Sequence, residues 1–172
     1  MEHFPLFLNL HGRRVLVVGA GLVAARKIAL LLSAGARVTV LAKAAHPSVS
    51  AQAEQGHISL HLGAFDAQWL QGMWLVIAAT NDEALNAAVA QAASARQLWC
   101  NVVDDAARSS AQVPAIVDRA PLTIAISSGG AAPVIARRLR ERIDSLVEPS
   151  IGWLTALARR QRAAIRRARP EL

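Results

Sequence analysis

A glycine-containing turn near the N-terminus has the composition and spacing to bind an anion through its backbone. Gly19, Gly21 and Ala24 form the pattern G-x-G-x-x-A directly after an apolar run. In such a turn the first glycine makes the bend, the second lets the backbone approach a pyrophosphate, and the third small residue lets helix and strand pack closely. The N–H groups of Leu22 and Val23, at the start of the expected helix, would face the phosphates. The turn therefore predicts a dinucleotide-binding site.

A carboxylate is the second group that could do chemistry. Asp104 follows the apolar stretch 99–103, at the carboxyl edge of the expected sheet, where folds of this type bind their ligands. A carboxylate in that position can accept a proton from a reacting group. Asp105 is adjacent, and an aspartate at the start of a loop also serves as a turn or cap residue.

The elements that must position these groups follow from the apolar patterning. Short continuous apolar runs predict buried strands at residues 14–19, 37–41, 57–62, 75–79 and 99–103. Helices are expected at residues 22–34 and 47–55, and Thr80 and Glu83 have capping-box spacing for a third that runs to about Arg96. Strands that alternate with helices indicate an α/β fold, a Rossmann-like doubly wound parallel sheet covered on both faces.

The pattern changes after residue 105. The elements expected there are strands at 115–117 and 122–126 and helices at 133–147 and 150–168. A second glycine turn, Ser127–Gly130, precedes Pro133, which suits the first turn of a helix. The predicted organisation is a nucleotide-binding domain at 1–112, a small α+β region at 113–147 and the start of a short helical tail at 148–172.

Composition limits the class of protein. The chain has 172 residues, of which 53% are apolar, and no apolar run approaches the ~20 residues of a membrane span. Cys100 is the single cysteine, so no disulfide forms within the chain and a reducing cytoplasm fits best. The net charge is +7, with ten arginines and three acids between Arg137 and Arg169. Such a surface suits a nucleic acid, an anionic membrane or a small polyanionic substrate.

Four segments, spanning roughly residues 4–147, carry a resemblance to one known family. They read FPLFLNLHGRRVLVVGAGLVAARK, LVIAATND, WCNVVDD and VPAIVDRAPLTIAISSGGAAPVIARRLRERI. The first includes the pair Arg26–Lys27, and the last two are more specific than the glycine turn. On these segments the chain resembles the precorrin-2 dehydrogenase/sirohydrochlorin ferrochelatase family, which forms the N-terminal module of sirohaem synthases and also occurs as a stand-alone enzyme.

The resemblance implies an activity and partners. The reaction is NAD-dependent oxidation of precorrin-2 to sirohydrochlorin, and many members also insert ferrous iron to give sirohaem. Asp104 would be catalytic and accept the protons that both reactions release. The substrate is a tetrapyrrole with eight carboxylates, which arginines pair bidentately, so a basic protein needs neither nucleic acid nor membrane. Region 113–147 would form a homodimer, because its strands otherwise leave unprotected edges.

The candidate site residues fall into two groups. The candidate cofactor-binding residues are Gly19, Gly21, Leu22, Val23, Ala24, Lys43, Ala44, Thr80 and Asn101. The candidate substrate-binding residues are Ser128, Gly129, Gly130, Arg137, Arg138 and Arg140. The sequence does not decide whether these arginines bind carboxylates or form a solvated helix face. No fixed metal site is expected: His57 and His61 are four residues apart and could share a strand face, Cys100 has no partner at ligand spacing, and all three are interpreted as structural.

Several alternatives stay open at this stage. No acid ends the second strand; Lys43 could meet the 2′-phosphate of NADP, or backbone groups could hold an NAD ribose, and the resemblance favours NAD. The family's phenylalanine shortly before Pro114 and its polar residue at the position of Leu22 are missing. The sequence ends at Leu172 without a methyltransferase domain, as either a fragment or a shortened form. A regulatory protein that binds NAD(H) without turnover is the alternative function, and it needs the glycine turn but not Asp104.

Overall fold

The structure, a computed structural model, describes residues 2–169, apart from the side chains of residues 163 and 165. It contains two compact units, Met1–Gln112 and Val113–Leu172. The first unit carries the glycine turn and Asp104, and the second carries the glycine turn at Ser127–Gly130 and most of the arginines.

Unit 1 is built on a five-stranded sheet in which every pair of neighbours is parallel. The strands are β1 (Arg14–Val18), β2 (Arg37–Ala42), β3 (Ser59–Leu62), β4 (Leu75–Ala78) and β5 (Trp99–Val102), in the order β3-β2-β1-β4-β5. The chain therefore adds strands to one side of β1 and then to the other. The reversal places a topological switch point at the carboxyl ends of β1 and β4, where ligands bind in folds of this type.

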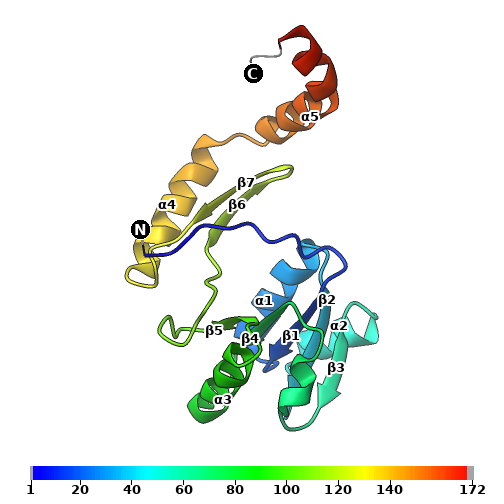
Figure 1. Ribbon diagram of the computed structural model, residues 1–172, viewed down its shortest axis with the longest axis vertical. Helices are drawn as coiled ribbons and strands as arrows, with labels where there is room; N and C mark the ends of the chain where they lie inside the picture. Colours follow the sequence, from blue (N-terminus) through cyan, green and yellow to red (C-terminus); the bar gives the residue numbers. More distant parts are fainter. Residues whose placement is uncertain (1, 170–172) are drawn as a thin grey trace. The chain divides into compact units, whose positions relative to one another are not determined.

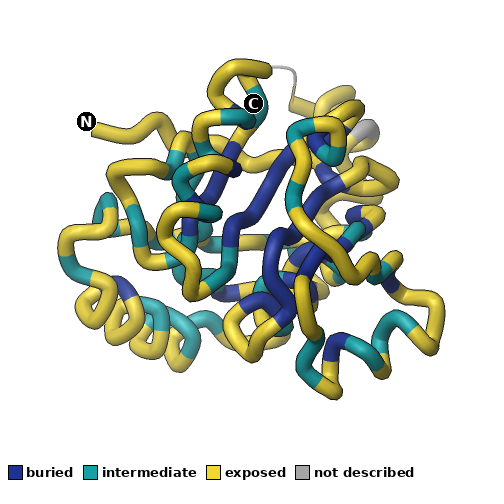
Figure 2. Tube along the Cα trace, turned by 90° about the horizontal axis from the view of Figure 1, so that it is seen from below, coloured by how far each residue is buried: buried dark blue, intermediate teal, exposed yellow. Residues whose placement is uncertain are grey.

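Helices cover both faces of this sheet (Figure 1). They are α1 (Leu22–Ser33), α2 (Pro47–Glu54) and α3 (Glu83–Ser94), with a short 3-10 helix at Ala67–Leu70. One apolar cluster joins α1 and α2 to the sheet, and a second joins α3 and the 3-10 helix to the opposite face. Figure 2 shows the resulting layer of buried backbone at the centre. Burial on both faces explains why the strands read as continuous apolar runs rather than alternating ones.

Unit 2 is an antiparallel pair of strands with two helices. The elements are β6 (Ala115–Arg119), β7 (Leu122–Ile126), α4 (Pro133–Leu146) and α5 (Ser150–Ala168). The guanidinium of Arg119 joins β6 to the end of α4, because its Nε donates to Val147 O at 2.9 Å and its Nη2 lies 2.8 Å from the Asp144 carboxylate. Gly152 packs α5 against the β6–β7 turn, where a Cβ would lie 2.7 Å from Arg119 O.

The α/β fold class expected from the sequence is confirmed, but some local predictions are wrong. The capping box at Thr80 is absent: Asp82 caps α3 by accepting from Leu85 N at 3.0 Å, while the Thr80 hydroxyl donates to Asn86 Oδ1 at 2.7 Å. The helix also ends at Ser94 rather than near residue 96. The third strand begins at residue 59, so His57 lies outside it and shares no strand face with His61.

Candidate nucleotide-binding and catalytic site

Gly19 is placed where no other residue fits. It follows β1 directly, with its N–H donating to Leu41 O at 2.8 Å, and its φ is +106°. A Cβ on Gly19 would lie 2.3 Å from Ala79 O and 3.1 Å from Thr80 Cγ2. The backbone after β1 therefore passes directly against the backbone after β4, at the switch point of the sheet. This close approach is the tight turn that the glycine spacing predicted.

Gly21 and Ala24, the next two residues of the pattern, leave the start of α1 open to an anion. A Cβ on Gly21 would meet nothing within 4 Å, and Gly21 is the N-cap of α1 without a side-chain hydrogen bond. The first turn of α1 holds no acid, and Leu22 and Val23 are exposed there. Ala24 is fully buried, so the helix packs closely on the sheet. A dinucleotide pyrophosphate fits this cradle, because the first N–H groups of a helix have no acceptor within the helix.

The other predicted cofactor residues border the same edge of the sheet. Lys43 and Ala44 follow β2 directly and are exposed. Thr80 follows β4, with its methyl group beside Gly19. Asn101 lies in β5 and is buried; its Nδ2 donates to Ala111 O at 3.0 Å, while its Oδ1 has no hydrogen-bond partner among the described residues.

Asp104 lies two residues beyond the end of β5 and is exposed. Its φ is +58°, a left-handed conformation that aspartate tolerates better than most residues and that marks a constrained turn. The strands β1, β4 and β5 are parallel, so Asp104 follows the same edge of the sheet as Gly19 and Thr80.

Asp105 has a different environment, although it is the next residue. Its Oδ1 accepts from the backbone N–H of Arg108 at 3.0 Å, and its Oδ2 pairs with the Arg108 guanidinium. The hydrogen bond from the backbone of Arg108, followed by that from its side chain, lowers the pKa of Asp105. Asp105 is thus a turn-capping carboxylate, engaged within its own loop.

Lys27 is a titratable residue that sequence reasoning left outside the site. It lies on α1, and burial lowers the pKa of its ammonium, while the negative charge of Asp104 raises it. Among the described residues, no hydrogen bond or ion pair joins Lys27 to Asp104. The only signal available earlier was the pair Arg26–Lys27 within the first family-like segment, which gave no hint of its neighbour.

The predicted substrate-binding residues all lie in unit 2, on the turn before α4 and on α4 itself. Gly129 and Gly130 have φ of +65° and +86°, and the Ser128 hydroxyl accepts from Ala132 N at 3.1 Å. Arg137 and Arg138 are exposed, and Arg140 is partly buried. The turn is therefore a compact, hydrogen-bonded start of α4 with arginines one turn further along.

His61 and Cys100 have surroundings that are typical of structural residues rather than of metal ligands. The His61 ring lies 4.9 Å from Trp69, and burial raises the pKa of the Cys100 thiol to about 11. Among residues 2–169, no three His, Cys, Asp or Glu side chains lie close enough together to hold a metal ion.

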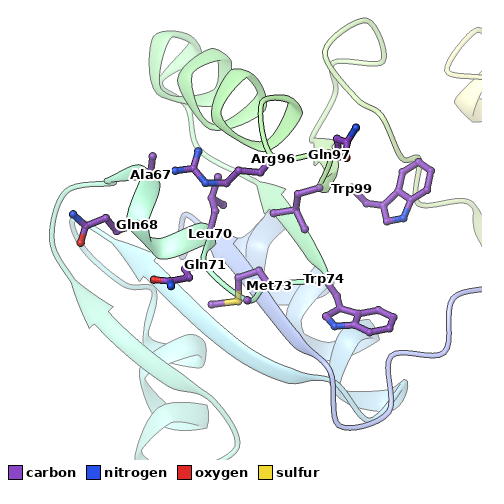
Figure 3. Close-up of a pocket in the computed structure, with 11 residues that line it drawn as sticks. Ala67, Gln68, Leu70, Gln71, Met73, Trp74, Arg96, Gln97 and Trp99 are labelled. Atoms are coloured by element: carbon purple, nitrogen blue, oxygen red, sulfur yellow. The ribbon is translucent and has the colours of Figure 1, made fainter.

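A hollow of about 640 Å³ lies at the amino-terminal edge of the sheet, away from the glycine turn (Figure 3). It is bordered by Trp74, Arg96 and Trp99. Ligands of doubly wound folds bind at the opposite, carboxyl edge, so this hollow is not the candidate site.

Comparison with known families identifies the class. Residues 6–115 match the family described as "Putative NAD(P)-binding", and residues 119–146 match that of the "Sirohaem biosynthesis protein central" region. The chain belongs to this NAD(P)-binding family, with the sirohaem-biosynthesis region following it. The family recognised from the four segments is confirmed, as is the nicotinamide dinucleotide as the class of cofactor.

Curated relatives are sirohaem synthases. The chain is 51% identical over 170 residues to the siroheme synthase of Xylella fastidiosa, covering 98% of this chain and 36% of the relative. It is 46% identical over 167 residues to that of Citrobacter koseri, covering 97% of this chain and again 36% of the relative. The chain thus spans about a third of the length of these proteins.

A solved structure is similar over nearly the whole chain. It is described as "SirC, precorrin-2 dehydrogenase", with a TM-score of 0.78 and 29% sequence identity. The likeness covers 96% of this chain and 81% of the other. Within residues 2–169 no helix has the length and apolar character needed to cross a membrane.

Proposed function

We propose that this chain catalyses the NAD-dependent oxidation of precorrin-2 to sirohydrochlorin, a step of sirohaem biosynthesis, in the cytoplasm. The observation that carries the proposal is the likeness to a precorrin-2 dehydrogenase over 96% of the chain. The geometry supports it, because the cradle at Gly19–Ala24 and the carboxylate of Asp104 follow the same edge of one sheet.

The proposed chemistry needs one hydride acceptor and one base. The oxidation removes a hydride and a proton from precorrin-2, and the nicotinamide, when bound, supplies the hydride acceptor. The pyrophosphate is held by N–H groups at the start of α1. Asp104 accepts the proton at a carboxylate oxygen and passes it to solvent, because its side chain is exposed. Asp105 takes no part, since its carboxylate is bound to Arg108.

Unit 2 supplies the substrate contacts and the dimer in this proposal. Arg137, Arg138 and Arg140 pair with substrate carboxylates, and the N–H groups of the turn Ser128–Gly130 bind a further anionic group. Homodimerisation through residues 113–147 is supported by the exposure of large apolar side chains on α4, which a monomer leaves in water. They are Val134, Ile135, Leu139 and Leu146. Residues 148–172 then begin a helical tail.

A second activity, insertion of ferrous iron into sirohydrochlorin, is favoured by the curated relatives, which are described as siroheme synthases. Iron is then a substrate rather than a resident ion. Metal insertion must remove two pyrrole N–H protons, and Asp104 can accept them as it does in the oxidation. The same carboxylate would serve both reactions.

The test is incubation of the purified protein with precorrin-2 and NAD, with and without ferrous iron, following product absorbance. Sirohydrochlorin formation that depends on NAD supports the dehydrogenase, and a further spectral change with iron supports the second activity. NAD binding without any product would instead support the alternative, a regulatory protein that senses NAD(H). The variant Asp104→Ala should lose turnover if the chain is the dehydrogenase, whereas a sensor of NAD(H) does not need that carboxylate.

A further inference from the structure

The hollow at the amino-terminal edge of the sheet is lined by aromatic rings and cations as well as by apolar side chains. Trp74, Arg96 and Trp99 border it, and its volume of about 640 Å³ lies in the range of small-molecule sites. A second hollow of about 660 Å³, which Arg14 lines, adjoins the first at Gln71. The two form one recess within unit 1 that the proposed oxidation does not use.

Two tryptophan rings lie partly in water at this recess. Trp74 directly precedes β4, and Trp99 begins β5 in register with Leu75, so the two lie at the amino ends of neighbouring strands (Figure 3). Each tryptophan is 46% exposed. Single exposed apolar residues are common, but two indoles beside one concave surface form a patch of the kind that marks binding sites. The rings therefore offer a surface on which another flat ring can stack.

Three guanidinium groups accompany the rings. The guanidinium carbon of Arg13 lies 3.8 Å from the centroid of the Trp74 ring. Arg14 lies against the backbone of Gly72, where a Cβ would come within 3.3 Å of its Nη1. Arg96 uses one N–H donor on a backbone carbonyl of α3. Among residues 2–169, none of these three arginines forms an ion pair, so their charges are not neutralised within the chain.

The charges at the recess define the class of ligand. Asp66 is the acid that lines it, and its Oδ1 accepts from the backbone N–H of Gln68 at 2.7 Å as the cap of the short 3-10 helix. Three guanidiniums therefore outweigh this carboxylate, and the recess attracts anions. Guanidinium groups bind carboxylates and phosphates bidentately, and indoles stack on flat conjugated rings. A ligand that uses both features is planar and anionic.

We propose that this recess is a second binding site, which takes a planar, conjugated polyanion and is separate from the cradle at Gly19–Ala24. Trp74 and Trp99 hold the flat face of the ligand, and Arg14 and Arg96 pair with its carboxylates or phosphates. A tetrapyrrole polycarboxylate and a purine nucleotide share this chemistry. The inference goes beyond the oxidation of precorrin-2 and does not rest on it, because the recess and the cradle lie at opposite edges of the parallel strands β1, β4 and β5.

The test is an NMR titration of the full chain that follows the indole N–H signals. The ligands are uroporphyrin, a planar tetrapyrrole polycarboxylate, and in a separate experiment ATP, both with saturating NAD so that the cradle is occupied. We expect one of them to shift the signals of Trp74 and Trp99, and the ligand that does so identifies the source. Trp153, which is 84% exposed on α5, reports non-specific stacking. A shift of Trp153 with the same midpoint as the other two would overturn the site.

Variants separate this recess from a general effect of positive charge. Arg14→Gln and Arg96→Gln should each weaken binding on the order of 10-fold by removing a charge-assisted pair, and Trp99→Ala should do so by removing a stacking surface. Arg37→Gln is the matched control, because Arg37 is exposed at the amino end of β2 and does not line the recess. Its affinity should stay within about two-fold of wild type. Equal weakening in Arg14→Gln and Arg37→Gln would contradict the proposal.

The wild-type titration decides the proposal even if a variant fails to fold. Absence of binding by both ligands up to millimolar concentration would refute the site. Signals of Trp74 and Trp99 that shift with protein concentration before any ligand is added would also refute it, because a second copy of the chain would then cover the recess. Neither measurement uses precorrin-2, so the result is independent of whether the chain is a dehydrogenase.

Discussion

Replacement by alanine should affect folding at one glycine of the turn and cofactor binding at the other. Gly19→Ala adds a methyl group toward the backbone of Ala79, whereas Gly21→Ala adds one toward open space at the start of α1. The first change should therefore affect folding, and the second should affect cofactor binding. Because both replace glycine by alanine two residues apart, each variant is the control for the other.

The cost of Gly19→Ala has two parts. Alanine at φ +106° is in a region that glycine alone adopts freely, at a cost of about 1–3 kcal/mol. The added Cβ would lie 2.3 Å from Ala79 O and 2.8 Å from Ala79 C; these are backbone atoms that cannot rotate away, and such overpacking costs about another 1–3 kcal/mol. The free energy of unfolding should fall by several kcal/mol, a large share of a domain's stability.

Gly21→Ala should leave the fold nearly intact. Gly21 has φ −81° and ψ −175°, an extended conformation open to any residue, and the loss of glycine at an N-cap costs at most about 1 kcal/mol. The added methyl group occupies the approach of the pyrophosphate. An overlap worth about 1–3 kcal/mol in the complex would weaken NAD binding by about 5- to 150-fold.

Urea unfolding measures the first effect, and isothermal titration with NAD measures the second. Gly19→Ala should unfold at clearly lower urea than the other two proteins. Gly21→Ala should unfold near wild type but bind NAD far more weakly. If Gly21→Ala binds NAD as tightly as wild type, the pyrophosphate does not lie against this turn. If Gly19→Ala keeps full stability, the close contact with Ala79 is not present in solution.

Other substitutions test the remaining assignments. Asp104→Ala should lower dehydrogenase turnover on the order of 10²–10⁴-fold with NAD affinity unchanged, whereas Asp105→Asn should stay active; near-wild-type oxidation by Asp104→Ala would refute the base. NAD should bind more tightly than NADP, and ten-fold tighter NADP binding would reverse that choice, in which case Lys43→Asp should restore the preference for NAD. Cys100 should react slowly with a thiol reagent at pH 8, because with a pKa of about 11 roughly one thiol in a thousand is ionised; labelling at the rate of an exposed thiol would contradict its burial. Light scattering should give a dimer at tens of micromolar, and Leu139→Glu on the exposed face of α4 should shift it to monomer, whereas a wild-type monomer would refute the interface.

The sequence determined the features that depend on neighbouring residues. Continuous apolar runs such as Val15–Val18 predicted buried parallel strands, because a sheet covered on both faces leaves no polar side. The glycine spacing predicted the turn after β1, since the bend and the close packing need small residues at set positions. The position of Asp104 directly after an expected strand was enough to predict that it lies at the carboxyl edge of the sheet.

The tertiary structure decided which of several local options is realised. Thr80 and Asp82 both precede α3 and are both common caps, and the structure selects Asp82 because Asn86 binds the Thr80 hydroxyl. Asp104 and Asp105 are identical in type and adjacent, and the hydrogen bonds from Arg108 single out Asp105 as the structural one. Each choice depends on a side chain a few residues away whose direction the sequence pattern does not state.

The close approach of Gly19 to the backbone of Ala79 depends on the tertiary structure alone. It requires that β4 lies beside β1. Strand order comes from contacts between residues far apart in the chain, whereas apolar periodicity reports only the exposure of each element's own faces. The sequence therefore determined the cofactor turn and the candidate base, and only the folded sheet brought the turn after β1 against the backbone after β4.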